Sequence, residues 1–133
     1  AESFLNAIGV STLTSEANAI GLKNSTFMKG GGPYTTANDQ ALLLGMIATG
    51  QNFSSANQQR LLEAMKKNVF RKGIPAGVSG TVADKVGFMN GLLHDSAIIY
   101  GSHGTYVLSI MTDGASWEAI ADLAKQLDAL QAQ

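Results

Sequence analysis

The sequence predicts an α+β fold in which helices come first, three consecutive strands follow, and one helix ends the chain. Apolar residues recur at helical spacing up to about residue 70, whereas from Gly73 onward the chain changes to short β-rich runs broken by glycine. Because no helices separate the strands, this order favours an antiparallel meander over a parallel α/β alternation. The 133 residues suffice for one domain or part of one, mainly helical over 1–70, with the sheet and last helix over 71–133.

The first two predicted helices are short. They cover residues 3–9 and 11–20, and Gly21 stands where a left-handed residue usually closes a helix. The run Gly30-Gly31-Gly32-Pro33 then predicts a firm break in regular structure.

A longer helix is expected between Thr36, which can cap its start, and Gly50. Asp39 would lie at the third position, where a negative charge interacts favourably with the helix dipole. The helix is apolar almost all round, which predicts burial on more than one side, through Leu42, Leu43, Leu44, Met46 and Ile47.

The two remaining helices begin at serines. Ser54 or Ser55 can cap a helix that ends near Asn68, and Ser116 can cap the last helix. The apolar residues of the last helix form one stripe that should lie on one face of the sheet, namely Ile120, Leu123, Ala124, Leu127 and Leu130.

The strands are expected in the second half of the chain. Glycine and proline in the segment 73–80 argue against a regular helix there, and residues 81–83 begin an extended segment. Two further β-rich runs, 92–100 and 105–112, are separated by the loop Gly101-Ser102-His103-Gly104, whose length suits a hairpin. The three strands therefore predict an antiparallel meander.

Composition argues against several classes of partner and site. The net charge is −1, and the basic residues are nowhere denser than in the pairs Lys66-Lys67 and Arg71-Lys72, so we expect no nucleic-acid partner. Cysteine is absent, and no apolar run approaches the ~20 residues of a membrane helix, so we expect no disulfide and no membrane insertion. His94 and His103 lack a third ligand at a suitable spacing, so we expect no metal site and no cofactor.

Several short segments, taken in order, carry a family resemblance. They are Phe4-Leu5-Asn6-Ala7-Ile8-Gly9, Ala19-Ile20-Gly21-Leu22-Lys23-Asn24-Ser25-Thr26-Phe27, Tyr34-Thr35-Thr36-Ala37-Asn38-Asp39, Gly73-Ile74-Pro75-Ala76-Gly77-Val78 with Ala83-Asp84-Lys85, and Tyr106-Val107-Leu108-Ser109-Ile110-Met111-Thr112. Together they resemble the C-terminal portion of a penicillin-recognising serine hydrolase, the superfamily of class A β-lactamases and D-alanyl-D-alanine peptidases. The resemblance implies a β-lactamase-like fold, in which residues 1–133 form a single partial domain.

In that family a Lys-Thr-Gly strand forms one wall of the active site, and the resemblance places Lys85, Val86 and Gly87 there. It implies that Lys85 helps bind a substrate carboxylate and that Gly87 lets the substrate lie against the strand. The N–H of Phe88 would supply part of the oxyanion hole. These four residues are the expected substrate-binding residues, and the implied ligand is a β-lactam or a peptidoglycan peptide.

The chain departs from the family pattern at the residues that carry the chemistry. Val86 stands where Thr or Ser offers a hydroxyl to the carboxylate. No serine lies three residues before a lysine, so the Ser-x-x-Lys nucleophile motif is missing and we expect no catalytic residue in this chain. Thr26-Phe27-Met28-Lys29 imitates it by chance, and helix capping explains the Ser-x-Asn imitation Ser55-Ala56-Asn57. The loop 27–34 holds no acid, so the deacylating glutamate of class A enzymes is missing as well.

The sheet is expected to be incomplete in this chain. The family sheet has two more strands, supplied by the N-terminal part of the protein, and the strand 106–112 would then present a long apolar edge, which soluble proteins normally cover. Three possibilities follow for the cover, namely an N-terminal fragment of the same protein, a second copy of the chain by strand exchange, or a rearranged fold in which the terminal segments substitute.

Three functions remain open at this point. The first is the C-terminal part of a β-lactamase-like or D,D-peptidase-like serine hydrolase that is inactive alone. Because the glutamate is missing, the completed enzyme would deacylate slowly. The second is a non-catalytic pseudo-enzyme module that binds peptidoglycan peptides or a partner protein, and the third is a structural domain with a purely ancestral resemblance. The resemblance also implies an extracytoplasmic location.

Overall fold

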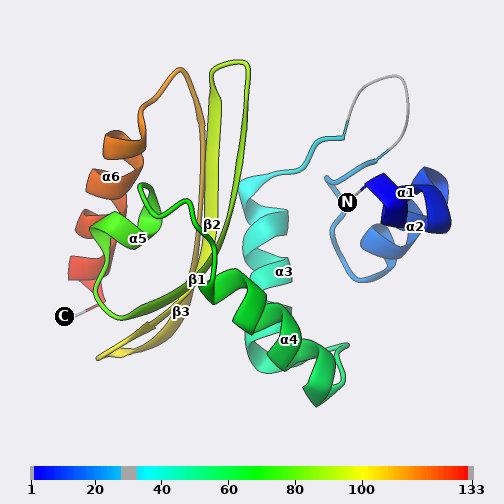
Figure 1. Cartoon of the computed structure of the whole chain (residues 1–133), viewed down its shortest axis with the longest axis horizontal. Coiled ribbons are helices and arrows are strands. Elements are labelled where there is room, and N and C mark those ends of the chain that lie inside the picture. The colour runs from blue at the N-terminus through cyan, green and yellow to red at the C-terminus, as the bar shows by residue number, and fades with distance from the viewer. Residues whose placement is uncertain (1, 28–32, 132–133) are drawn as a thin grey trace.

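The computed structural model describes residues 2–27 and 33–131, and Figure 1 shows how their helices and strands are arranged. The elements, in chain order, are α1 (Glu2–Ile8), α2 (Val10–Ala19), α3 (Ala37–Thr49), α4 (Ser55–Lys66), α5 (Ile74–Gly77), β1 (Thr81–Met89), β2 (Leu92–Gly101), β3 (Gly104–Asp113) and α6 (Trp117–Leu130). The predicted α+β order is confirmed. Within the described residues, no helix is both long and apolar enough to span a bilayer.

The sheet is an antiparallel meander in the order β1-β2-β3. Asn90 and Gly91 connect β1 to β2, and both have positive φ, 51° and 86°, as the tightest hairpin turns require. The register pairs Lys85 with Ser96 and Val86 with Asp95. In the described chain β1 and β3 are the two edges of the sheet, so the edge of β3 is open as expected.

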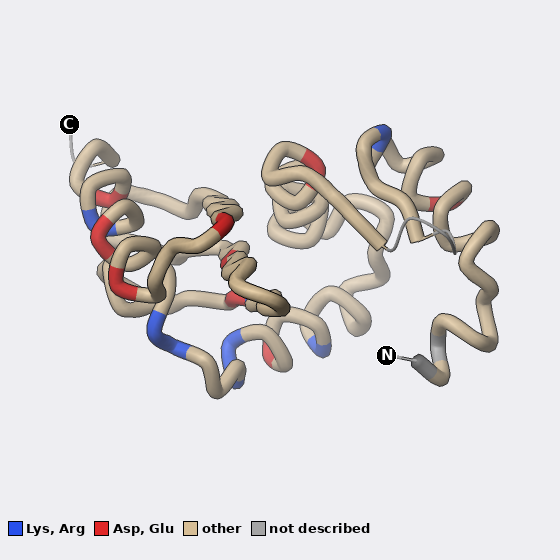
Figure 2. The backbone as a smooth tube through the Cα atoms, turned by 90° about the horizontal axis from the view of Figure 1, so that it is seen from above, with Lys and Arg blue, Asp and Glu red and all other residues tan. Residues whose placement is uncertain are grey.

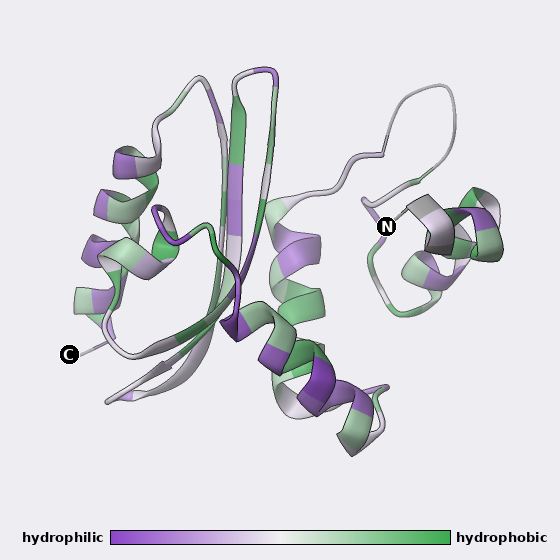
Figure 3. Cartoon of the chain, viewed as in Figure 1, coloured by the Kyte–Doolittle hydropathy of each residue, from purple (hydrophilic) through white to green (hydrophobic). Residues whose placement is uncertain are grey.

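Helices cover both faces of the sheet (Figure 1). On one face α5 and α6 close a core made of Ile74, Val82, Ala97, Ile99, Ile110, Ile120 and Ala124. On the other face α3 and α4 close a second core made of Leu44, Ile47, Met65, Ala83 and Ile98. Figure 3 shows the corresponding mixture of apolar and polar positions along α4 and α6, as in helices with one buried side.

Three predicted helix starts are confirmed by side-chain caps. Thr36, Ser54 and Ser116 each accept a hydrogen bond from the backbone N–H three residues later, at the starts of α3, α4 and α6. Gly50 ends α3 with a φ of 75°, a left-handed conformation that favours glycine. The predicted break at Gly30-Gly31-Gly32 lies outside the described residues.

Two expectations about the helices need correction. The segment 73–80 contains one short helix, α5, because Pro75 lies in the first turn, where its missing N–H costs nothing. On α6, Ile120 and Ala124 are buried, but Leu123 and Leu130 are exposed, so its stripe is only partly covered.

Asp39 lies in the first turn of α3, as expected for an interaction with the helix dipole, and it has a tertiary role as well. Its carboxylate is buried and accepts hydrogen bonds from the N–H of Asn24, at 2.8 Å, and the hydroxyl of Ser25, at 2.7 Å. The Ser25 hydroxyl is also 2.7 Å from that of Thr35. Asp39 therefore ties the segment after α2 to the start of α3, whereas α1 and α2 lie beyond α3, away from the sheet (Figure 1).

Candidate active-site wall

The outer edge of β1 is covered along its first half and exposed along its second. The guanidinium of Arg71 donates to the carbonyl oxygen of Val82 from both terminal nitrogens, each at 3.2 Å, and the amide of Asn68 lies 3.4 Å from the carbonyl oxygen of Asp84. The segment between α4 and α5 therefore lies along this edge. Farther along β1, Gly87 and Phe88 are exposed.

The backbone N–H and C=O groups of the even-numbered residues of β1 point to this edge. The carbonyl groups of Val82 and Asp84 accept side-chain hydrogen bonds there. In an antiparallel strand the N–H and C=O of one residue point to the same side, and the side alternates along the strand. The N–H of Phe88 therefore points outward at the exposed end of the edge, where the resemblance expects an oxyanion-hole donor.

Lys85 lies at the boundary between the two halves of the edge. Its side chain leaves the face of the sheet that α3 and α4 cover, it is exposed, and its Nζ donates to the carbonyl oxygen of Val86 at 2.6 Å. The ammonium group is thus held beside the outer edge of β1. A cation at this place can bind the carboxylate of a ligand that lies along the strand.

Val86 differs from Lys85 in the face of the sheet to which its side chain points. The side chain of Val86 is buried on the opposite face, on the strand position paired with Asp95, so at this site only its backbone is available. Gly87 is exposed, and a Cβ there would meet only atoms of His94, at 4.0 Å. Packing within the described chain therefore does not require this glycine, and the surface along β1 is left free for a ligand.

Two buried carboxyl groups beneath β1 and β2 anchor the covering segment. Asp84 is fully buried, forms an ion pair with Arg71 and accepts a hydrogen bond from the amide of Asn68 at 2.5 Å. Burial raises the pKa of the Asp84 carboxyl, and the positive charge of Arg71 and the hydrogen bond from Asn68 oppose that rise.

Asp95 is the second buried carboxyl group. Its Oδ2 accepts the N–H of Ile74 at 2.8 Å, while its Oδ1 is buried without a hydrogen-bond partner in the described part of the chain. Burial raises the pKa of Asp95 to about 6, and the nearby charge of Asp84 adds to the rise. Gly73 allows this contact, because a Cβ at Gly73 would collide with Oδ2 of Asp95.

The sequence analysis did not find these anchors. The available signal was an acid inside each of two strands that are otherwise apolar, since alternation along a strand places Asp84 and Asp95 on the same face as buried residues. The same alternation brings Ser96 and Ser109 into one row with Lys85 across the sheet, where their hydroxyl oxygens are 2.8 Å apart. The wall is therefore polar beyond Lys85 itself.

Of the residues that imitate a nucleophile or a metal site, His94 adjoins this wall as the β2 partner of Gly87. Thr26 forms an isolated bridge with Tyr34, and Met28 and Lys29 lie outside the described residues. His94 accepts the N–H of Thr112 at 3.3 Å. His103 lies in the turn at the other end of β2, and the residues that the structure describes contain no group of three metal-binding side chains.

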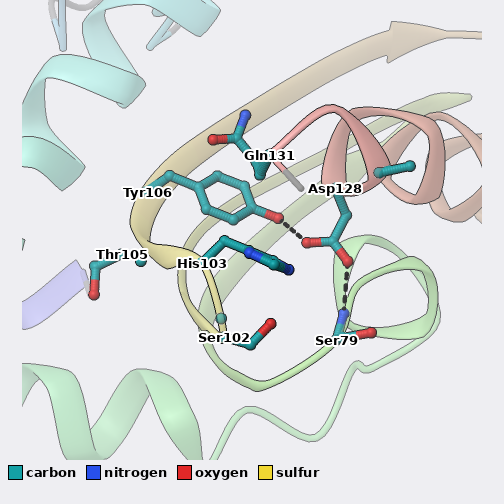
Figure 4. A pocket seen from close by; sticks show the side chains of 10 residues that line it. Ser79, Ser102, His103, Thr105, Tyr106, Asp128 and Gln131 are labelled. Carbon is teal, nitrogen blue, oxygen red and sulfur yellow. Dashed lines mark hydrogen bonds between the residues drawn. The ribbon is translucent and has the colours of Figure 1, made fainter. Parts of the chain in front are cut away.

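A separate pocket of about 240 Å³ lies at that other end, between the β2–β3 turn and the end of α6 (Figure 4). The hydroxyl of Tyr106 donates to Asp128 at 2.5 Å, and the N–H of Ser79 donates to its other carboxylate oxygen at 3.0 Å. Burial and the hydrogen bond to Asp128 raise the pKa of Tyr106. Both oxygens of Asp128 are thus used to join the end of α6 to the sheet, which is a structural role.

Comparison with known proteins decides which family this wall belongs to. The sequence profile of the beta-lactamase enzyme family matches residues 2–131. The chain belongs to this family. A search of curated proteins gave no significant match.

Solved structures show the same fold. The structure of PBP-A matches with a TM-score of 0.81 and 23% identity over 92% of this chain and 51% of that chain. A beta-lactamase from Sphaerobacter thermophilus matches with a TM-score of 0.87 and 20% identity over 98% of this chain and 56% of that chain. The putative class A beta-lactamase PenP from Rhodopseudomonas palustris matches with a TM-score of 0.78 and 24% identity, over 92% and 55% of the two chains. The chain therefore spans about half the length of these structures.

Proposed function

We propose that this chain supplies the active-site strand of a serine hydrolase of the β-lactamase or D,D-peptidase type and is inactive alone. The exposed end of the β1 edge carries the proposal, because the ammonium of Lys85 and the outward N–H of Phe88 lie on it close together in sequence. A carboxylate and a developing oxyanion are the two negative charges that such a pair can bind. Gly87 between them leaves the strand surface free.

The nucleophile must then come from outside this sequence. No Ser-x-x-Lys motif is present, and the matched structures are about twice as long as the chain. We propose that an N-terminal part of the same protein supplies the nucleophile helix, and that this part, or a second copy by strand exchange, covers the open edge of β3. The family assignment also supports an extracytoplasmic location.

The proposed ligand carries a carboxylate, as a β-lactam or a peptidoglycan peptide does. A variant of PBP-A, a protein of the same fold, has been solved as an acyl-enzyme complex with penicillin G. In this chain Val86 gives no hydroxyl to the carboxylate, and the loop 27–34 holds no acid to direct a deacylating water. These two features favour slow release of an acyl group over efficient hydrolysis of an antibiotic.

A non-catalytic binding module is the second candidate. Two features favour it, namely the absence of Ser-x-x-Lys from the sequence and Val86 in place of a hydroxyl residue. Such a module would keep the wall at Lys85 and bind peptidoglycan peptides or a partner protein without covalent chemistry. Covalent labelling separates the two candidates.

The test uses the protein made from its complete reading frame and a fluorescent penicillin. The hydrolase proposal predicts a covalent adduct, and Lys85→Ala should slow its formation by about 10- to 100-fold, because one charge-assisted hydrogen bond to the ligand is lost. Lys125→Ala, an exposed lysine on α6, is the matched control and should label like the parent. Labelling of Lys85→Ala at the parental rate would overturn the proposal, and saturable binding without any adduct would favour the binding module.

A further inference from the structure

An aromatic cluster adjoins the exposed end of the β1 edge. The rings of Phe70 and Phe88 meet edge to face with centroids 5.2 Å apart, and Phe88 meets Trp117 in the same way at 6.2 Å. Phe70 and Phe88 are nevertheless 49% and 54% exposed. Large aromatic rings held in fixed contact but left half in water are a common feature of binding surfaces.

The cluster borders a small hollow on the same side of the molecule. This cavity has a volume of about 80 Å³ and is lined by Val69, Phe70, Arg71, Lys72 and Trp117. A cavity needs only about 10–15 Å³ to admit one water molecule, so this one has room for a small part of a ligand. Its walls are mainly apolar, since Arg71 is engaged with Asp84 and Val82.

The hollow is rigidly placed relative to the proposed wall. Arg71 and Asn68 fix the segment that carries Phe70 onto the first half of the β1 edge, through their hydrogen bonds to Asp84. The ring of Phe88 meets Trp117 on the face of the sheet that α6 covers, whereas the side chain of Lys85 leaves the other face and reaches the outer edge at the carbonyl oxygen of Val86. The aromatic cluster and the ammonium of Lys85 therefore flank the exposed edge from its two sides.

Charge is also distributed to suit a ligand with a negative group. Basic residues gather on α4 and the segment after it, whereas acids lie along α6 (Figure 2). Lys85 and Lys72 are exposed, and in the described part of the chain neither takes part in an ion pair. Lys72 thus lines the hollow itself, and Lys85 supplies a second positive charge at the outer edge of β1.

We propose that Phe70, Phe88 and Trp117 form a subsite that binds an aromatic or flat apolar substituent of the ligand whose carboxylate contacts Lys85. This inference rests on the proposed function and adds to it a preference for ligands with an aromatic or flat apolar substituent. Phe70 is the specificity-determining residue, because it borders both the hollow and the ring of Phe88. The ligand class is therefore a carboxylate with an aromatic side group, rather than one with a small polar group.

The experiment compares two probes on the protein made from its complete reading frame. One is benzylpenicillin, and the other is the penicillin nucleus with a free amine in place of the phenylacetyl group, so both share the ring system and the carboxylate. The acylation efficiency is measured for each by mass spectrometry of the adduct. The parent should prefer benzylpenicillin, and Phe70→Ala should reduce the ratio of the two efficiencies by about 10-fold.

Two further variants make the result specific. Phe70→Leu keeps an apolar side chain without the ring and should give an intermediate ratio of the two efficiencies. This variant also tests the subsite if Phe70→Ala folds poorly. Tyr34→Ala removes another exposed aromatic residue, 61% exposed and outside the cluster, and should leave the ratio unchanged. Adducts with both probes and a parental ratio in both Phe70 variants would overturn the subsite while leaving the proposed hydrolase intact. No adduct with either probe would overturn both.

Discussion

Arg71 pairs with Asp84 across the outer edge of β1, and the same guanidinium donates to the carbonyl oxygen of Val82. The Asp84 side chain is completely buried, whereas that of Arg71 is 39% exposed. The pair therefore fastens an exposed connecting segment to the interior of the sheet. It fixes the border between the covered and the exposed halves of the edge, which is where Lys85 lies.

Replacement of Arg71 by methionine should destabilise the fold by about 2–4 kcal/mol. Removal of one partner leaves the other as an uncompensated buried charge, and the partial exposure of Arg71 reduces the usual penalty somewhat. Chemical denaturation measures the change. Arg60→Met, an exposed arginine on α4, is the matched control and should change the stability by less than about 0.5 kcal/mol. In the double variant with Asp84→Asn much of the loss should be recovered, and a strictly additive double variant would contradict this account.

Stability should fall as the pH rises through the range from about 4 to 6, because of Asp95. The folded-state pKa of about 6 lies above the model value of 3.8, so in this range the folded state binds more protons than the unfolded state. Its contribution is fully present below pH 3.8 and is lost above pH 6, a change of about 3 kcal/mol. Denaturant titrations across this range measure the slope.

Asp95→Asn should flatten that slope, since asparagine can still accept the N–H of Ile74 but does not ionise. The pKa of Asp84 is also raised, so the stability of the Asp95→Asn variant should still decline as the pH rises, but less steeply. The parent and the variant are therefore compared with each other at each pH. Equal slopes in the two proteins would show that Asp95 does not titrate in this range.

Gly77→Ala should destabilise the chain by about 1–3 kcal/mol, as overpacking of a tight contact usually does. A Cβ at Gly77 would collide with the backbone carbonyl of Ala121 in α6 and would lie 3.0 Å from the N of Lys125. Gly45→Ala is the matched control, because a Cβ there would meet nothing within 4 Å in the interior of α3. That control should stabilise the protein by about 0.5–1 kcal/mol, which thermal unfolding can detect. A neutral Gly77→Ala would contradict the close contact of α5 with α6.

Local signals were sufficient to predict most of the fold. Serine and threonine caps fix helix starts through one side-chain hydrogen bond, so Thr36, Ser54 and Ser116 could be identified from their neighbours alone. Helix α5 was missed because Pro75 was interpreted as a helix breaker, although it is tolerated in a first turn. The exposure of Leu123 and Leu130 was missed because a stripe in the sequence does not say how much of it a partner element covers.

The candidate site was predictable only in part. The resemblance supplied the prediction of Lys85 and Gly87, but the anchors Arg71, Asp84 and Asp95 depend on contacts between residues that are distant in sequence. The contact of Phe70 with Phe88 is of the same kind, since it joins the segment after α4 to the end of β1. Local pattern and spacing carry no information about such pairs.

Native mass spectrometry of this chain, with and without penicillin, tests the central claim most directly. The account predicts that the chain alone remains unlabelled because it lacks a Ser-x-x-Lys nucleophile. It also predicts that, in the presence of the proposed N-terminal part, the chain enters a complex in which the penicillin adduct is on that part. A penicillin adduct on the 133-residue chain, or a chain that stays monomeric and unlabelled even with the N-terminal part present, would contradict it.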